Sequence, residues 1–146
     1  MSTISQFLAP DHHRCDSLFA LTEESAASGE WEKTADNFAS FRKALAHHFA
    51  MEEQVMFPAF EEHTGMTAGP TQVMRMEHQQ MRELLGQMAE AAQKRDKEEF
   101  LGLSDTLLLI MQQHNVKEEQ MLYRMADQAL AGATDDLVRR MREIAE

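Results

Sequence analysis

The sequence has little of what β-structure and disulfide scaffolds require. Its 146 residues include one cysteine, three prolines and six glycines. The single thiol, Cys15, has no partner for an internal disulfide, which is typical of a reducing compartment. Valine and isoleucine are scarce, and no stretch alternates apolar and polar residues, so strands are not expected. The sequence therefore predicts an all-α protein.

Basic residues are also few. Fourteen lysines and arginines stand against 25 acidic residues, which gives a formal net charge of −11. Nucleic-acid backbones and anionic membranes require a basic face, so neither is an expected partner. No apolar run approaches the length of a membrane span, and residues 1–4 contain neither the basic nor the apolar part of a secretion signal. We therefore expect a cytosolic, cytoplasmic location.

Apolar residues recur every three or four positions, and turn signals divide this pattern into helices. We expect long helices over residues 10–29, 31–58, 71–93 and 96–130, and a short one over 135–146. Pro10 suits a first helical turn, and Pro58 is expected to kink or end the second helix. Asp96 with Glu99 matches a capping box. This pattern predicts a single domain over 1–146, an up-down-up-down four-helix bundle with a short C-terminal helix.

A ten-residue segment occurs twice, 66 positions apart. Residues 48–57, HFAMEEQVMF, return as residues 114–123, HNVKEEQMLY. At the same offset Asp11-His12 returns as Glu77-His78. Each half therefore contains one His-x-x-x-Glu pair, whose members share a face of a helix, and one further histidine. We expect two helical hairpins of one design, related by a pseudo-twofold axis.

Polar side chains interrupt the apolar stripe of each expected helix. His78, for example, lies between Met74 and Met81 at helical spacing. A buried carboxylate without a partner costs on the order of several kcal/mol or loses its charge. Two carboxylates that converge with four imidazoles in an apolar core therefore need a cation between them. The predicted metal ligands are His12, His48, Glu52, His78, His114 and Glu118.

A pair of metal ions fits this set, with histidines on each metal and the two glutamates as bridges. Imidazole and carboxylate donors without thiolates favour iron or manganese over a structural zinc. A single zinc site and a hydrogen-bonded polar core without metal are the alternatives. Among adjacent histidines, His12 is preferred to His13 because it aligns with His78, whereas His13 aligns with Gln79.

Four further carboxylates flank the predicted ligands. Glu53 and Glu119 lie one step off the core-facing stripe, so we expect them to be solvated or to form salt bridges between helices. Asp11 and Glu77 precede ligand histidines. They are either hydrogen-bond acceptors for the ligands or simple surface charges.

The order of these motifs resembles that of the hemerythrin or hemerythrin-like (HHE) cation-binding domains. An early Asp-His, two His-x-x-x-Glu steps and a Glu-His between them carry the resemblance, which covers about residues 10–126. It implies a four-helix bundle around a non-haem di-iron centre. Two carboxylates and an oxo or hydroxo group would bridge the two iron ions, and zinc or manganese are the alternative cofactors.

The chain departs from the oxygen carriers of this family. Those carriers use five histidines, two of them four apart on the third helix, whereas Met74 and Arg82 flank His78 here. The set of four histidines and two glutamates is more similar to a bacterial branch that repairs iron centres, responds to nitric oxide or senses iron.

The resemblance thus implies a protein that binds or senses oxygen, nitric oxide, peroxide or iron itself. The alternative is a di-iron enzyme: a peroxidase, a nitric oxide reductase or an iron donor for damaged centres. Turnover would require a redox partner protein. The sequence leaves the oligomeric state open.

Overall fold

The computed structural model describes residues 2–146, and in this part of the chain it contains helices and no strand. The elements are α1 (Ile4–Ala27), α2 (Trp31–Met51), the π-helical turn η1 (Glu52–Met56), α3 (Phe57–Thr64), α4 (Pro70–Gln93), α5 (Lys97–Lys117), the π-helical turn η2 (Glu118–Leu122), α6 (Tyr123–Ala129), the 3₁₀ turn η3 (Ala131–Ala133) and α7 (Thr134–Arg142). The predicted all-α bundle with a short C-terminal helix is confirmed.

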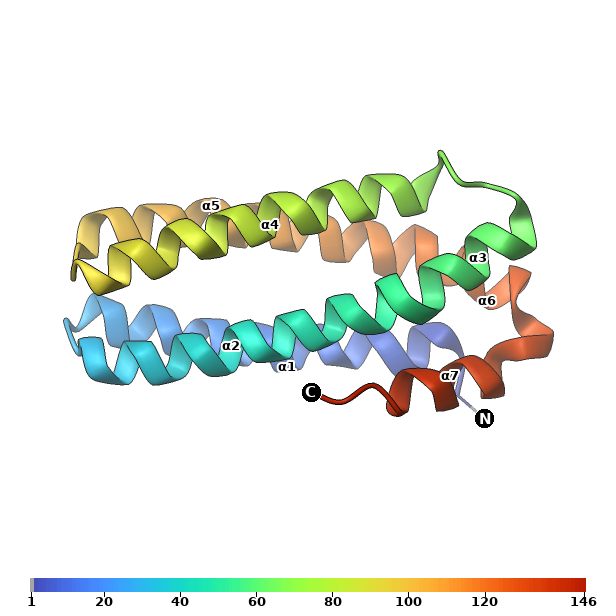
Figure 1. Cartoon of the computed structure of the whole chain (residues 1–146), viewed down its shortest axis with the longest axis horizontal. Helices are drawn as coiled ribbons and strands as arrows, with labels where there is room; N and C mark the ends of the chain where they lie inside the picture. Colours follow the sequence, from blue (N-terminus) through green and yellow to red (C-terminus); the bar gives the residue numbers. More distant parts are fainter. Residues whose placement is uncertain (1) are drawn as a thin grey trace.

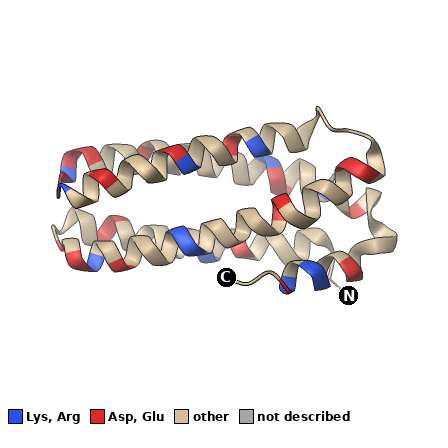
Figure 2. Cartoon of the chain, viewed as in Figure 1, with Lys and Arg blue, Asp and Glu red and all other residues tan. Residues whose placement is uncertain are grey.

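Four rods run antiparallel to their neighbours in sequence (Figure 1). The rods are α1, the continuous α2–η1–α3, α4, and the continuous α5–η2–α6. Helix α1 contacts α2 and α5, and α4 contacts α5 and α2, which closes the bundle. Helix α7 folds back beside the N-terminal end of α1 (Figure 1). Acidic and basic residues are interspersed along the helices (Figure 2).

Helix α1 begins well before Pro10, so the predicted start of the first helix is wrong. The hydroxyl of Thr3 accepts a hydrogen bond from the backbone N–H of Gln6 at 3.0 Å. The side-chain oxygen of Gln6 accepts one from the N–H of Thr3, also at 3.0 Å. This reciprocal capping box satisfies the first donors of the helix. Pro10 therefore lies inside α1 and not at its first turn.

Pro58 does not end the second helix, which continues to Thr64 and stops at Gly65 with φ 74°. The wide turn η1 comes first, and Pro58 then falls in the opening turn of α3. Proline has no backbone N–H, so Pro58 adds no hydrogen bond to this turn, whereas its neighbour Phe57 still bonds to the carbonyl of Glu52. The rod therefore continues through Pro58.

Two apolar clusters fill the bundle, and a polar layer separates them. One cluster, near α3, α6 and α7, includes Leu8 and Met74; the other, toward the opposite end, includes Cys15 and Met81. Along α1, His12 lies between the two clusters, and His78 does so along α4. Within residues 2–146, no helix combines the length and the apolar character needed to cross a membrane.

Candidate metal centre

The structure brings all six predicted ligands together in this polar layer. They come from six elements: His12 from α1, His48 from α2, Glu52 from η1, His78 from α4, His114 from α5 and Glu118 from η2. Their exposed fractions lie between 0% and 3%. His13 is exposed, so His12 faces the cluster and His13 does not.

The donor atoms fall into two groups, each compact enough to surround one ion. Glu52, His78, His114 and Glu118 form the first group, and His12, His48 and Glu118 form the second. Within each group the ligand atoms lie within 4.8 Å of one another. Glu118 belongs to both groups, which is the position that a bridging carboxylate requires.

Each central carboxylate reaches a histidine from either half of the repeat. Oε1 of Glu52 lies 3.6 Å from Nε2 of His48 and 3.1 Å from Nε2 of His78. Oε1 of Glu118 lies 3.2 Å from Nε2 of His114 and 3.1 Å from Nε2 of His12. The pseudo-twofold relationship expected from the repeat therefore extends to the geometry of the site.

The Nδ1 atom of every histidine in the cluster forms a hydrogen bond with a carboxylate outside the six central residues. We call these four side chains the outer carboxylates. The pairs are Asp11–His48 at 2.8 Å, Glu77–His114 at 2.8 Å, Glu53–His78 at 2.7 Å and Glu119–His12 at 2.7 Å. A neutral imidazole that donates its Nδ1 proton outward presents the Nε2 lone pair inward. The four pairs thus fix the tautomer and the ring orientation that a metal ligand needs.

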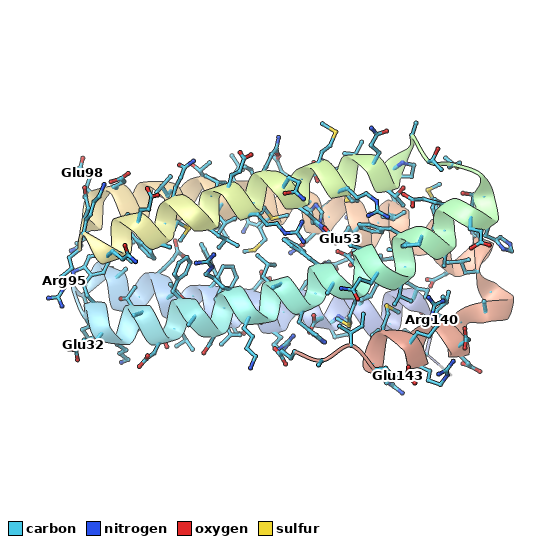
Figure 3. The ribbon with its side chains drawn as sticks, in the orientation of Figure 1. Glu32, Glu53, Arg95, Glu98, Arg140 and Glu143 are labelled. Carbon is cyan, nitrogen blue, oxygen red and sulfur yellow. The ribbon has the colours of Figure 1, made fainter. Side chains whose placement is uncertain are left out.

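Asp11 and Glu77 are therefore hydrogen-bond acceptors for the histidines and not simple surface charges. Glu53 lies on the side of η1 that faces α4 (Figure 3), where it also pairs with Arg82 at 2.8 Å. Burial raises the pKa of Glu53, but hydrogen bonds from His78 and Arg82 outweigh burial and lower it to about 2. Arg82 thus supports the carboxylate that holds His78.

Asp11 and Glu77 also have cationic partners. Nε of Arg14 donates to Asp11 at 2.8 Å, and Nζ of Lys117 donates to Glu77. Burial raises the pKa of Asp11, but hydrogen bonds from His48 and Arg14 lower it well below its usual range. Arg14 thus helps to keep Asp11 charged, and the charged carboxylate accepts the Nδ1 proton of His48.

Tyr123 contacts the centre, although its sequence position favours a packing role over a place at the site. Its side chain is fully buried, and its hydroxyl donates to Oε2 of Glu52 at 2.7 Å. The same oxygen lies 3.0 Å from Glu118 and 3.3 Å from Nε2 of both His12 and His48. Burial and the two carboxylates raise the pKa of Tyr123 well above its ordinary value.

The turn η2 places Tyr123 there. The N–H of Tyr123 bonds to the carbonyl of Glu118, five residues before it. In an α-helix, residues five apart lie on different faces, whereas the wider π-helical turn brings them together. The equivalent turn η1 closes with the N–H of Phe57 bonding to the carbonyl of Glu52. A repeated π-helical turn after each ligand glutamate is therefore part of the site.

Buried histidines and glutamates at the centre alter one another's proton affinity. Burial lowers the pKa of His114, but attraction to Glu118 outweighs burial and raises it to about 9. Attraction to Glu52 raises the pKa of His48 above its ordinary value in the same way. Burial raises the pKa of Glu118, whereas the nearby His114 holds it well below its usual range. Glu118 is thus charged and requires positive charge around it.

The unpartnered atoms of the centre show that these residues fit a metal. In the described residues, six buried side-chain atoms have no hydrogen-bond partner, and four belong to Glu52, His78, His114 and Glu118. Such atoms cost about 1–3 kcal/mol each when nothing satisfies them. Nε2 of His78 and Oε1 of Glu52 lie 3.1 Å apart without forming a hydrogen bond. Donors about 2.1 Å from one ion lie about 3 Å apart at right angles, so this spacing suits metal ligands.

Cys15 lies one turn from His12 but is not part of the centre. It is 2% exposed and belongs to the second apolar cluster. Burial raises the pKa of its thiol to about 11, so at neutral pH the side chain is an uncharged core residue.

Comparison with known proteins gives a match to the model of a protein family. A family model described as Hemerythrin HHE cation binding domain matches residues 3–126. The matched region includes the six central residues and the four outer carboxylates, and it ends before α7. Neither the curated proteins nor the solved structures contain a match.

Proposed function

The chain belongs to the hemerythrin HHE cation-binding family, and from this premise we propose that it is a non-haem di-iron protein that binds or senses a small ligand. The ligand is oxygen, nitric oxide or peroxide, or iron itself when the protein acts as a sensor. One observation carries the proposal: the buried cluster divides into two donor groups that share Glu118. A hydrogen-bonded core without metal would leave four of its central polar atoms unsatisfied.

His12 and His48 would hold one iron, and His78 and His114 the other. Glu52 and Glu118 would bridge them, since each carboxylate lies close to one histidine of either pair. The iron pair supplies redox activity and an affinity for small diatomic molecules and peroxide. The outer carboxylates orient the histidines, and the apolar clusters on both sides exclude bulk water.

The alternative function is a di-iron enzyme, either a peroxidase, a nitric oxide reductase or an iron donor for damaged centres. Glu119 favours it, because this side chain is 39% exposed and also hydrogen-bonds to the buried His12. It therefore links the centre to solvent and offers a route for protons. Such an enzyme would need a redox partner protein as its source of electrons.

The acidic composition and the lone cysteine support a cytosolic location without a nucleic-acid or membrane partner. The similarity to the bacterial four-histidine, two-glutamate branch supports a role in sensing or in response to nitric oxide, and not in oxygen transport.

Metal analysis of protein purified without an affinity tag tests the di-iron assignment. We expect about two iron ions per chain and a visible absorption that disappears on chelation. Protein that binds about one zinc and no iron, or no metal after iron is supplied, would contradict the proposal.

Anaerobic titration of the reduced, iron-loaded protein with oxygen, peroxide or nitric oxide separates the two functions. Binding predicts a stable absorption change that reverses when the ligand is removed. Catalysis predicts repeated consumption of the ligand when a chemical reductant is supplied. If one of these three molecules is neither bound nor consumed, it is not the ligand of the protein.

A further inference from the structure

The pseudo-twofold relationship between the halves breaks at aromatic positions beside the centre. Phe57 and Tyr123 are equivalent in the repeat, and each closes a π-helical turn. The ring of Phe57 lies 5.6 Å from that of His78, and Phe49 stacks on His78 at 3.8 Å. The His78 side of the centre is therefore covered by apolar rings, whereas the other side carries the hydroxyl of Tyr123.

The two donor groups are also unequal in number. The group around His78 and His114 has four donors, and the group around His12 and His48 has three. The hydroxyl oxygen of Tyr123 lies within 3.3 Å of a donor atom of all three residues in the smaller group. It occupies the place of a fourth donor there, at the spacing that the other donors show.

We propose that the phenolate oxygen of Tyr123 is a further ligand of the iron held by His12 and His48, so that the two irons differ chemically. The assignment rests on the proposed function. Coordination would replace the hydroxyl proton, which now points to Glu52, with the metal ion, and the proton would be released to solvent. An iron held by His78 and His114 would have no such oxygen, because Phe57 takes the equivalent place.

Tyr123 is the only tyrosine in the chain, which makes the test unambiguous. The iron(III)-loaded protein should show a visible phenolate-to-iron charge-transfer band, and resonance Raman excitation in that band should enhance the ring modes of a coordinated phenolate. Tyr123→Phe should lose the band and the modes completely, while iron remains at His78 and His114. Circular dichroism of the variant confirms that the bundle is intact.

A second measurement avoids iron and any activity. Gallium(III), a redox-inert substitute for iron(III), is added to the metal-free protein near neutral pH, and the ultraviolet difference spectrum is recorded. We expect the signal of one tyrosinate per chain in the wild type and none in Tyr123→Phe. Gallium that binds without this signal would overturn the assignment.

The failure of this inference can be told apart from the failure of the proposed function. Two bound irons without phenolate modes would overturn the tyrosine ligand and leave the di-iron proposal standing. A wild-type protein that binds no iron would overturn the di-iron proposal, and the tyrosine ligand with it.

Discussion

Oε2 of Glu53 lies 2.7 Å from Nδ1 of His78, although the two residues belong to different halves of the repeat. The equivalent contact joins Glu119 to His12 in the opposite direction, also at 2.7 Å. Each hairpin therefore orients a histidine of the other hairpin. Neither half can present an ordered set of ligands until the two hairpins have packed together.

The first prediction concerns this crossed contact. Glu53→Ala removes the hydrogen-bond acceptor of His78 and leaves Arg82 without its partner. Loss of such an outer partner typically costs about 10–100-fold in metal affinity, and we expect a loss in this range. Competition with a chelator of known affinity measures it. Glu62→Ala, an exposed carboxylate on the same rod, is the matched control and should retain wild-type affinity.

The second prediction concerns the adjacent histidines of α1. His12 is buried among the donors, whereas His13 is exposed. His12→Ala should therefore lose about half of the bound iron, because it removes a terminal donor from the smaller group. His13→Ala should bind as much iron as the wild type. Equal iron contents in the two variants would refute the placement of His12.

The third prediction is a pH dependence of the metal-free protein. The pKa of His114 is raised to about 9 from an unfolded value near 6.5. A raised pKa stabilises the folded state fully below about pH 6.5, and this stabilisation is lost as the pH rises through about 9. At about 1.4 kcal/mol per pKa unit, the full loss amounts to about 3–4 kcal/mol.

Urea unfolding of metal-free and iron-loaded protein between pH 6.5 and 9 provides the measurement. The loss should be confined to the metal-free form, because a metal-bound histidine is already deprotonated. A metal-free protein whose unfolding free energy is constant or rises over this range would contradict the charged state derived for His114.

The sequence was sufficient to predict that the six central residues lie close together, because two independent patterns agree on them, and their role as metal ligands stays a prediction. Helical periodicity places His48 and Glu52 on the core-facing stripe, and the repeat selects His12 over His13. The structure brings them together. Periodicity could not predict which outer carboxylate forms a hydrogen bond with which histidine. The crossed contact of Glu53 depends on how the two hairpins pack against each other, and a local sequence pattern contains no information on that packing.

For Tyr123 the sequence favours packing over a place at the centre, and the physical reason is different. It lies five residues after Glu118, and α-helical geometry assigns that position to another face. Only the π-helical turn returns it to the centre. The start of α1 does have a sequence signal, because Thr3 and Gln6 match a capping box, but Pro10 is a competing signal for a first helical turn.

The last prediction concerns α7, which lies outside the matched family region and packs against the turn that carries Glu52. Met141 is fully buried in the first apolar cluster, whereas Arg140 is exposed on the same helix and is labelled in Figure 3. Met141→Ala should lower the free energy of unfolding by about 2–5 kcal/mol, through lost burial and the cavity left behind. Arg140→Ala should change it by less than about 0.5 kcal/mol.

Thermal and urea unfolding at equal iron content compare the two variants of α7. Equal stabilities would mean that α7 is not an integral part of the bundle in solution. The larger loss in Met141→Ala would instead make α7 a support for η1. In that case the variant should also release iron to a chelator faster than Arg140→Ala, because the turn that positions Glu52 has lost part of its packing.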